Sequence, residues 1–307
     1  MKAATLEPVA LTEAAVSAPG FARNRPVADF AELIKARLTL LVLLTPAAGF
    51  YLGVVGPLDF AALFHAIFGT AMAAAGAAAL NQWWERRLDA LMDRTKSRPV
   101  AAGRMRPRNA FLTGVMLGLA GVIYLGFACN LLSASLAAVT IGIYIFAYTP
   151  LKRISTANTL IGAIAGALPP MIGWAAASGS LAPGAWSLFA ILFLWQMPHF
   201  FAIAWIYRAD YSRAGFQMVS TDDATGERSG SQSVLFCILL LIVGGIPTFI
   251  GMTTFNYLVI ELVLGGIFVA VAMRFLRMRT QRDARLLFFT SIIYLPALLI
   301  AMVLAKT

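Results

Sequence analysis

The sequence predicts an all-α polytopic membrane protein, with nine transmembrane helices around a central cavity that opens near the cytoplasmic face. Three observations carry this prediction. The 307-residue chain is 60% hydrophobic and only 12% charged, whereas a soluble domain has about 25% charged residues. The apolar residues gather in runs that are long enough to cross a bilayer as helices. Basic residues alternate between successive connections, which is typical of a chain that crosses a membrane repeatedly.

Runs of spanning length occur at residues 36–55, 61–81, 111–129, 132–149, 158–178, 185–206, 234–253, 256–274 and 286–304. Apolar runs of about 20 residues favour helices in lipid, because a helix satisfies its own backbone hydrogen bonds. Gly and Ala crowd the second and fifth runs, which indicates close helix packing. Pro169, Pro170 and Pro198 are expected to kink or break their helices beside a cavity. We assign residues 1–30 to a flexible cytoplasmic tail and residues 31–307 to one membrane domain.

The distribution of Lys and Arg predicts the topology. All of the 24 basic residues except Lys306 lie before residue 38 or in the connections at 82–110, 150–157, 207–233 and 274–285. Cytoplasmic connections carry such an excess, so we expect a cytoplasmic N-terminus and a C-terminus outside. Acidic residues near the N-terminus argue against a mitochondrial transit peptide, and we expect a bacterial cytoplasmic (inner) membrane. The net charge of +10 then indicates membrane lipid as a partner, and no nucleic acid.

Residues 81–98 carry a dense group of charges directly after the second apolar run. In this stretch Asn81, Glu85, Asp89 and Asp93 recur every fourth residue, which places neighbouring members one helical turn apart on one face. Oxygen ligands of this kind are those that Mg²⁺ prefers, commonly together with substrate phosphates. The spacing therefore predicts that the row binds a divalent cation.

The connection after the sixth apolar run supplies a further acid, Asp210, on the same predicted side of the membrane. We expect it to face the row across the cavity mouth and to complete the metal site. Asp222 and Asp223 follow in the same connection, where ordinary loop solubility explains them equally well. The basic residues expected to bind the phosphate oxygens of a metal-bound diphosphate are Arg94, Lys96, Arg98, Lys152 and Arg153. The plainer alternative is a solvated helix end with Arg86–Asp89 and Asp93–Lys96 ion pairs.

Five stretches carry a resemblance to a known family. They are the Asn81–Pro99 motif NxxxExxxDxxxDRTxxRP, Tyr148–Arg153 (YTPLKR), Gly166–Trp174 (GALPPMIGW), Trp195–Phe200 (WQMPHF) and Asp210–Gly215 (DYxxAG). Together they resemble the UbiA-type intramembrane prenyltransferases and, more narrowly, the family of protohaem IX farnesyltransferases. The resemblance covers roughly residues 30–305, in order and with compatible spacing.

The resemblance implies a fold, a reaction and site residues. A prenyl diphosphate would bind through Mg²⁺, its allylic C–O bond would ionise, and an acceptor would capture the carbocation. In the narrower family the substrates are farnesyl diphosphate and haem b, a vinyl group of which is the acceptor. A haem A synthase or the oxidase-assembly machinery is then a possible partner. The residues with implied roles are His199, Trp195 and Gln196 in haem binding and Tyr207 and Tyr211 in the second motif.

Two departures from the family pattern bear on the metal site. Glu85 stands where the family more often has Asp, a longer side chain that should still bind the metal. The second motif offers one aspartate, Asp210, where the superfamily typically has several, which puts a second protein-held Mg²⁺ in doubt.

Two other functions fit the sequence less well, and the acceptor class is still open. A transporter would place its charges near the midplane on broken helices, whereas here they gather at the mouth. A phospholipid head-group transferase would need a DxxDGxxAR pattern, which the sequence does not contain. An aromatic quinone precursor or another tetrapyrrole remains open as the acceptor. His65, Cys129 and Cys237 are interpreted as packing or interfacial residues.

Overall fold

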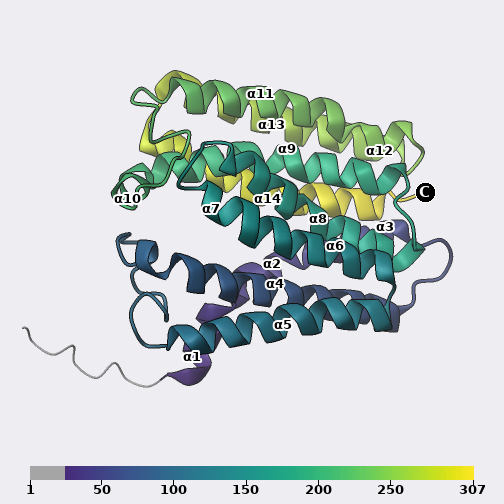
Figure 1. Ribbon diagram of the computed structural model, residues 1–307. Helices are drawn as coiled ribbons and strands as arrows, with labels where there is room; N and C mark the ends of the chain where they lie inside the picture. Colours follow the sequence, from purple (N-terminus) through teal and green to yellow (C-terminus); the bar gives the residue numbers. More distant parts are fainter. Residues whose placement is uncertain (1–24) are drawn as a thin grey trace, which may run out of the picture.

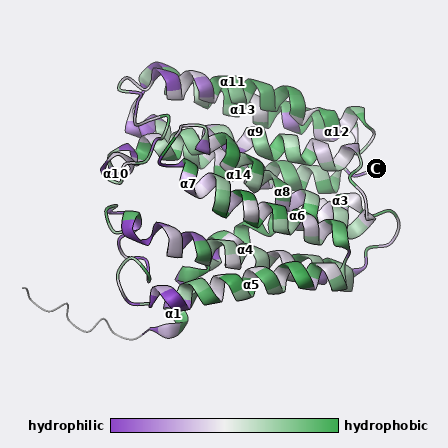
Figure 2. Ribbon diagram, viewed as in Figure 1, coloured by the Kyte–Doolittle hydropathy of each residue, from purple (hydrophilic) through white to green (hydrophobic). Residues whose placement is uncertain are grey.

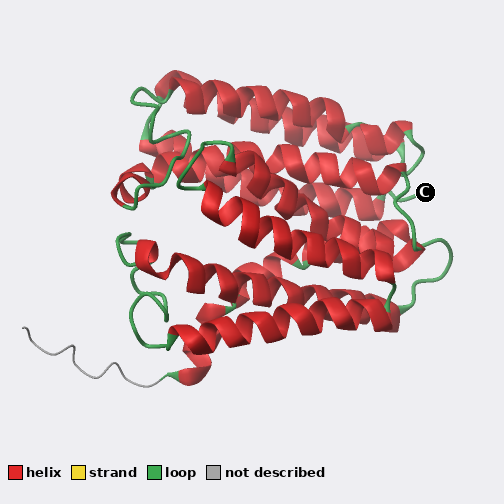
Figure 3. Cartoon of the chain, in the orientation of Figure 1, coloured by secondary structure: helices red, strands yellow, loops and turns green. Residues whose placement is uncertain are grey.

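The computed structural model describes residues 25–307, and this part of the chain is a bundle of helices without a sheet strand (Figures 1 and 3). Nine segments of the described chain are long and apolar enough to cross a membrane. They comprise α2 (Ala36–Val42) with α3 (Leu44–Gly53), α4 (Phe60–Asp89), α5 (Pro107–Ala128), α6 (Leu131–Gly142) with η1 (Ile143–Tyr148) and α7 (Thr149–Leu151), α8 (Asn158–Ser178), α9 (Pro183–Ile206), α11 (Glu227–Gly244) with α12 (Ile246–Phe249), α13 (Phe255–Met278) and α14 (Gln281–Leu304). The predicted nine-span, all-helical class is confirmed, and the chain is a multi-pass membrane protein.

Two predicted boundaries differ from the structure. Helix α1 (Pro26–Leu33) crosses the expected end of the tail at residue 30, and residues 1–24 lie outside the described part. The connection expected at 274–285 is mostly helical, since only residues 279 and 280 separate α13 from α14. Arg274 donates to Asp283 at 2.7 Å, and Thr280 caps α14 by accepting from the Asp283 amide at 3.1 Å. These contacts extend both helices beyond their apolar runs.

Small residues allow neighbouring helices to approach closely, as predicted. A Cβ on Gly76 of α4 would lie 2.3 Å from the backbone nitrogen of Gly118 on α5. On α8, a Cβ on Gly173 would lie 1.9 Å from the carbonyl oxygen of Pro46 on α3. Only glycine fits such contacts, because no real Cβ approaches backbone atoms so closely.

The prolines that were expected to kink or break their helices do not break them. Helix α8 continues through Pro169 and Pro170, and α9 continues through Pro198. All three are buried between neighbouring helices, and this tight packing stabilises the helical backbone around them. The first span is interrupted at Leu43 instead, where Thr45 donates its hydroxyl to the Val42 carbonyl at 2.9 Å. That carbonyl lacks its usual helical donor because position 46 is proline.

One end of the bundle gathers the polar residues (Figure 2). It contains α1, the ends of α4 and α7, and the short helix α10 (Arg208–Arg213), while the C-terminus lies at the other end (Figure 1). The connections that carry the basic residues meet at this polar end. The π-helical turn η1 lies near it, and its Tyr148 is followed directly by the short helix α7 and then Lys152.

Candidate active site

Three members of the predicted row lie on one buried face of α4. Asn81, Glu85 and Asp89 are only 1–3% exposed, and the helix continues beyond the second apolar run to Asp89. The spacing of four residues stacks their side chains one turn above the next. Buried carboxylates need partners that compensate their charge, and each side chain of the row has one.

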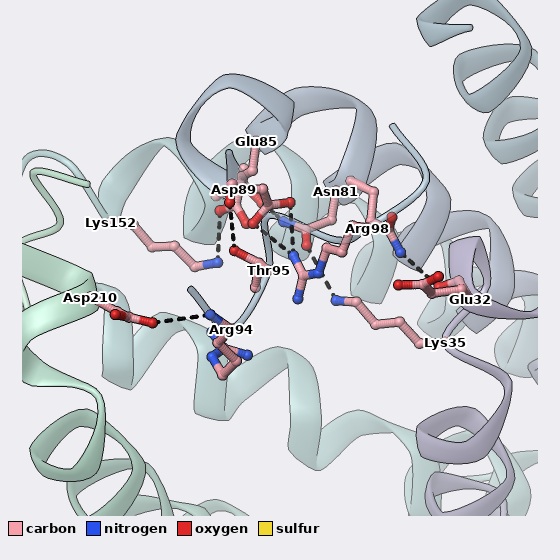
Figure 4. Close-up of polar contacts among 12 residues, drawn as sticks. Glu32, Lys35, Asn81, Glu85, Asp89, Arg94, Thr95, Arg98, Lys152 and Asp210 are labelled. Carbon is pink, nitrogen blue, oxygen red and sulfur yellow. Dashed lines mark hydrogen bonds and ion pairs between the residues drawn. The ribbon is translucent and has the colours of Figure 1, made fainter. Parts of the chain in front are cut away.

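The partners are cations from three separate segments (Figure 4). Lys35 Nζ donates to Asn81 Oδ1 at 3.3 Å, and Lys152 Nζ lies 2.7 Å from Glu85 Oε1. The Arg98 guanidinium donates through Nη1 to both carboxylate oxygens of Asp89, each at 2.8 Å. We call this set the α4 charge cluster; its members are Asn81, Glu85, Asp89, Lys35, Arg98 and Lys152.

Lys152 is fixed by aromatic rings as well as by Glu85. Its Nζ lies 4.4 Å from the Tyr148 ring centroid and 5.6 Å from that of Phe216, contacts that favour the ammonium form. Burial alone would lower the pKa of Lys152, but the neighbouring Glu85 carboxylate raises it above its ordinary value. Its backbone carbonyl accepts from the Gln217 amide at 2.6 Å, which ties the site to the connection after α10.

Lys35 is a site residue that sequence reasoning missed. It lies between α1 and α2 with φ of +50°, a left-handed conformation that side chains rarely adopt,. This backbone turn aims the side chain at Asn81. Burial, followed by repulsion from Arg98 and Lys152, lowers the pKa of Lys35 to about 7. The only sequence signal was a basic residue directly before the first apolar run.

Asp93 does not continue the row, contrary to the prediction. Helix α4 ends at Asp89, and the Thr95 hydroxyl donates to the Asp89 carbonyl at 2.9 Å as the chain turns. The Asp93 side chain is 63% exposed and pairs with Lys96 at 2.7 Å and with Arg213 at 2.5 Å. Hydrogen bonds from these two cations lower the pKa of Asp93.

Of the two ion pairs that formed the plainer alternative, only Asp93–Lys96 is present. Arg86 donates instead to the Trp83 carbonyl at 2.6 Å. The cation at Asp89 is Arg98, which comes from the following loop rather than from the helix itself. The solvated-helix interpretation therefore describes Asp93 and not the buried part of the row.

Asp210 meets the loop after α4 rather than the row itself. It accepts from the Arg94 backbone amide at 3.2 Å and pairs with Arg213 (Figure 4). The Arg94 guanidinium lies over the rings of Tyr207 and Tyr211, 5.2 and 5.8 Å from their centroids. Among residues 25–307, no three His, Cys, Asp or Glu side chains are grouped closely enough to share a metal ion. The five residues predicted to bind the metal therefore lie in two groups, with Asn81, Glu85 and Asp89 on α4 and with Asp93 and Asp210 at Arg213.

The remaining charged candidates lie outside the cluster. Arg153 is exposed, and Lys96 binds only Asp93 among the described residues. Asp223 is buried and caps α11, because its carboxylate accepts from the amides of Gly226 at 2.9 Å and Ser229 at 2.7 Å. The pKa of Asp223 is lowered by these bonds, which outweigh the opposite effect of burial.

A small cavity of about 40 Å³ lies near the cluster. Its walls come from η1, α8, α9, α10 and the following connection; the lining residues are Tyr148, Asn158, Thr159, Phe200, Ile203, Ala204, Tyr211 and Met218.

The candidate haem residues of α9 point in two directions. Trp195 and His199 face α14, where His199 Nδ1 lies 2.7 Å from Ser291 Oγ and the Trp195 indole donates to the Ser291 carbonyl at 2.8 Å. Gln196 faces α8 and donates to the Ala163 carbonyl at 3.3 Å. Of the three, Gln196 thus contacts a different helix from the other two.

The residues interpreted as packing fit that role. His65 Nδ1 lies 2.6 Å from the Tyr124 hydroxyl on α5. Both cysteines are free thiols within the described chain.

Comparison with known protein families shows which family the chain belongs to. Residues 42–293 match the model of the UbiA prenyltransferase family. The chain belongs to the UbiA prenyltransferase family. A protohaem IX farnesyltransferase of Solibacter usitatus is 43% identical over 277 residues, which cover 87% of this chain and 95% of that protein. The chain is therefore an enzyme, a membrane-embedded prenyltransferase.

Solved structures support the same fold. A digeranylgeranylglyceryl phosphate synthase superposes with a TM-score of 0.76 at 15% identity and covers 91% of this UbiA-family chain and 97% of its own. A UbiA homologue from Archaeoglobus fulgidus bound to GPP and Mg²⁺ superposes with a TM-score of 0.64 at 14% identity, covering 89% and 99%. At these identities the likeness concerns the fold alone.

Proposed function

We propose that this prenyltransferase transfers a farnesyl group from farnesyl diphosphate to a vinyl group of haem b, and that water adds to the resulting carbocation, which gives haem O, diphosphate and a proton. The observation that carries the proposal is the α4 charge cluster, in which buried acids and cations from distant segments meet at the polar end of a membrane bundle. The choice of haem b as the acceptor is supported by the relatives named protohaem IX farnesyltransferase.

The cluster fits a metal-bound diphosphate by charge and by ligand type. With Lys35 protonated, three cations against two carboxylates leave one net positive charge at this largely buried site; with Lys35 neutral, the charges balance. The oxygens of Asn81, Glu85 and Asp89 on adjacent turns suit Mg²⁺. When bound, Mg²⁺ neutralises charge that develops on the leaving diphosphate. Arg98 and Lys152 would then exchange their carboxylate partners, and Lys35 the Asn81 amide oxygen, for phosphate oxygens,.

We assign fewer residues to metal and diphosphate binding than the sequence predicted. Asp93 and Asp210 join the two connections through Arg213, so we assign them to closing the mouth rather than to binding the metal. Arg94 lies beside Tyr211 at the cavity and is the remaining cation within reach of the diphosphate. Trp195 and His199 are assigned to haem, with Phe200 of the same stretch lining the cavity.

We further propose that the enzyme resides in a bacterial cytoplasmic membrane with the polar end of the bundle in the cytoplasm. The exposed basic residues of that end would contact anionic lipid. The product, a hydroxyalkylated haem, then passes to an enzyme or assembly factor of haem A synthesis.

The test uses the purified full chain in detergent with farnesyl diphosphate, Mg²⁺ and haem b. Mass spectrometry of the extracted pigment should detect farnesylated haem, and its rate of formation should fall about 10²-fold when Asp89 is changed to Asn. The matched control is Asp222→Asn, because Asp222 is an exposed aspartate of the cytoplasmic loops outside the cluster. A product formed only with a quinone precursor would refute haem as the acceptor, and full activity of Asp89→Asn would refute the metal role.

A further inference from the structure

The chain enters the first membrane span through a break in the helix, which we call the α1–α2 turn and which consists of Ile34 and Lys35. Lys35 has φ of +50°, in the left-handed region that residues other than glycine rarely adopt. A helix that ran on from α1 into α2 would satisfy its own carbonyls. The break leaves the last carbonyls of α1 without these donors, so other groups have to supply the hydrogen bonds.

Gln82 of α4 supplies two of the missing donors. Its side-chain nitrogen donates to the carbonyls of Glu32 at 2.8 Å and Leu33 at 3.0 Å, the last two residues of α1. The orientation of the amide is fixed by chemistry, because both partners are carbonyl oxygens and only the amide nitrogen can donate to them. Gln82 is 1% exposed, and its own Oε1 is buried without a hydrogen-bond partner among residues 25–307. The hydrogen bonds of this side chain therefore all go to α1.

Asn81 and Gln82 are neighbours on α4 and contact the same turn at two places. Asn81 accepts from the Lys35 ammonium at 3.3 Å, and Figure 4 shows Lys35 pointing toward it. Gln82 binds the backbone two and three residues before Lys35. The Gln82 bonds thus fix the backbone from which the Lys35 side chain starts, while its end lies in the α4 charge cluster.

Two other contacts hold α1 on the bundle without reaching the charge cluster. Arg104 pairs with Asp29 at 2.8 Å and with Glu32 at 2.9 Å. Leu33 is fully buried in an apolar cluster. Loss of the Gln82 bonds should therefore leave α1 attached to the bundle and free only the α1–α2 turn.

We propose that Gln82 is a positioning residue for diphosphate binding, which presents the Lys35 ammonium to the phosphate oxygens by holding the α1–α2 turn. The inference rests on the proposed function for the diphosphate and not for the identity of the acceptor. Gln82 does not donate to the ligand, because both hydrogens of its amide are used by α1 carbonyls,. An ammonium that is already in place loses less freedom on binding than one that has to be ordered first, and such preorganisation increases affinity.

The test is a double-mutant cycle on the binding of inorganic diphosphate with Mg²⁺ to the purified full chain, measured by calorimetry. Gln82→Met removes both donors and keeps a side chain of similar length. It should weaken binding about 10-fold, and Lys35→Met should weaken it about 10–100-fold, as expected for hydrogen bonds to a charged group. In the Lys35→Met background, Gln82→Met should have less than about a twofold effect, because no ammonium is left to position.

The matched control is Thr70→Val, which removes a buried hydrogen bond to the Ala66 carbonyl within α4. It should leave the affinity for diphosphate unchanged in both backgrounds. Thermal unfolding of each variant shows whether the fold is retained, which the inference requires.

The outcomes separate this inference from the proposed function. Equal losses for Gln82→Met in the two backgrounds would overturn the inference, because Gln82 would then act independently of Lys35. A Gln82→Met chain without the wild-type unfolding transition would overturn it as well, because Gln82 would then serve general stability. Wild-type protein that does not bind diphosphate would refute the proposed function together with the inference. Wild-type protein that binds diphosphate but never farnesylates haem would refute the acceptor, and the cycle would still support the role of Gln82.

Discussion

The Lys152–Glu85 pair offers the sharpest test of the site because both partners are buried. Their side chains are 10% and 4% exposed, and Nζ lies 2.7 Å from Oε1. With so little solvent to screen the charges, the pair falls in the range of buried ion pairs, for which removing one partner costs about 3–5 kcal/mol. Lys152→Met should therefore destabilise the protein by this amount, since it leaves the Glu85 carboxylate without its cation.

The companion variant replaces both partners. Exchanging a buried ion pair for apolar residues of similar volume is often close to neutral, so Lys152→Met combined with Glu85→Leu should recover most of the lost stability. At about 2 °C per kcal/mol, the value for large domains, the single variant should melt about 6–10 °C below the wild type. The double variant should melt near the wild type but remain inactive.

The melting temperatures of the variants are measured by thermal unfolding in detergent, followed by tryptophan fluorescence. Their activity is measured as the rate of farnesyl transfer. The reasoning fails if the double variant is as unstable as Lys152→Met, because the pair would then contribute nothing through its charges. It also fails if the double variant turns over at the wild-type rate, because Lys152 and Glu85 would then lie outside the reaction.

Three further predictions follow from the same structure. Asp89→Asn should lower turnover about 10²-fold at saturating Mg²⁺, with normal membrane insertion, and an unchanged rate would exclude the metal role. Asp93→Asn should leave turnover close to wild type, because the exposed Asp93 carboxylate is outside the cluster and Asp210 still pairs with Arg213 at the mouth; a loss equal to that of Asp89→Asn would contradict this. Gly173→Ala should destabilise the bundle by about 1–3 kcal/mol, since its Cβ would meet the Pro46 carbonyl at 1.9 Å, whereas Gly266→Ala, with nothing within 4 Å, should not.

The fold was predictable because the membrane restricts what each segment can be. An apolar run in lipid has to be helical, and the alternation of basic connections checks the number of runs. Helix ends were less predictable. Residues 281–285 read as a connection from their charges, but Thr280 caps them and Asp283 pairs with Arg274. Such side-chain contacts extend a helix past its apolar run. A prediction based on hydropathy does not detect them, because the residues involved are polar.

The site was predictable where its residues are close in sequence. The spacing of Asn81, Glu85 and Asp89 predicted one helical face, and that face is present. The same spacing failed at Asp93, because the periodicity cannot show where α4 ends. The cations that complete the site come from far away: Lys35 and Lys152 are separated by 46 and 67 residues from their partners on α4. Only the packing of α2, α4 and η1 brings them together.

The pairing of acids with cations explains how a charged site persists inside a membrane protein. Uncompensated carboxylates of α4 would be too costly to bury, and three cations at one mouth would repel one another; after burial, this repulsion is the second cause of the lowered pKa of Lys35. In the α4 charge cluster each sign compensates the other. A metal-bound diphosphate offers the acids a cation and the basic residues an anion, so neither group loses its compensation when the substrate enters. The contacts that stabilise the fold without substrate would therefore favour a ligand that carries both charges, as the proposed function requires.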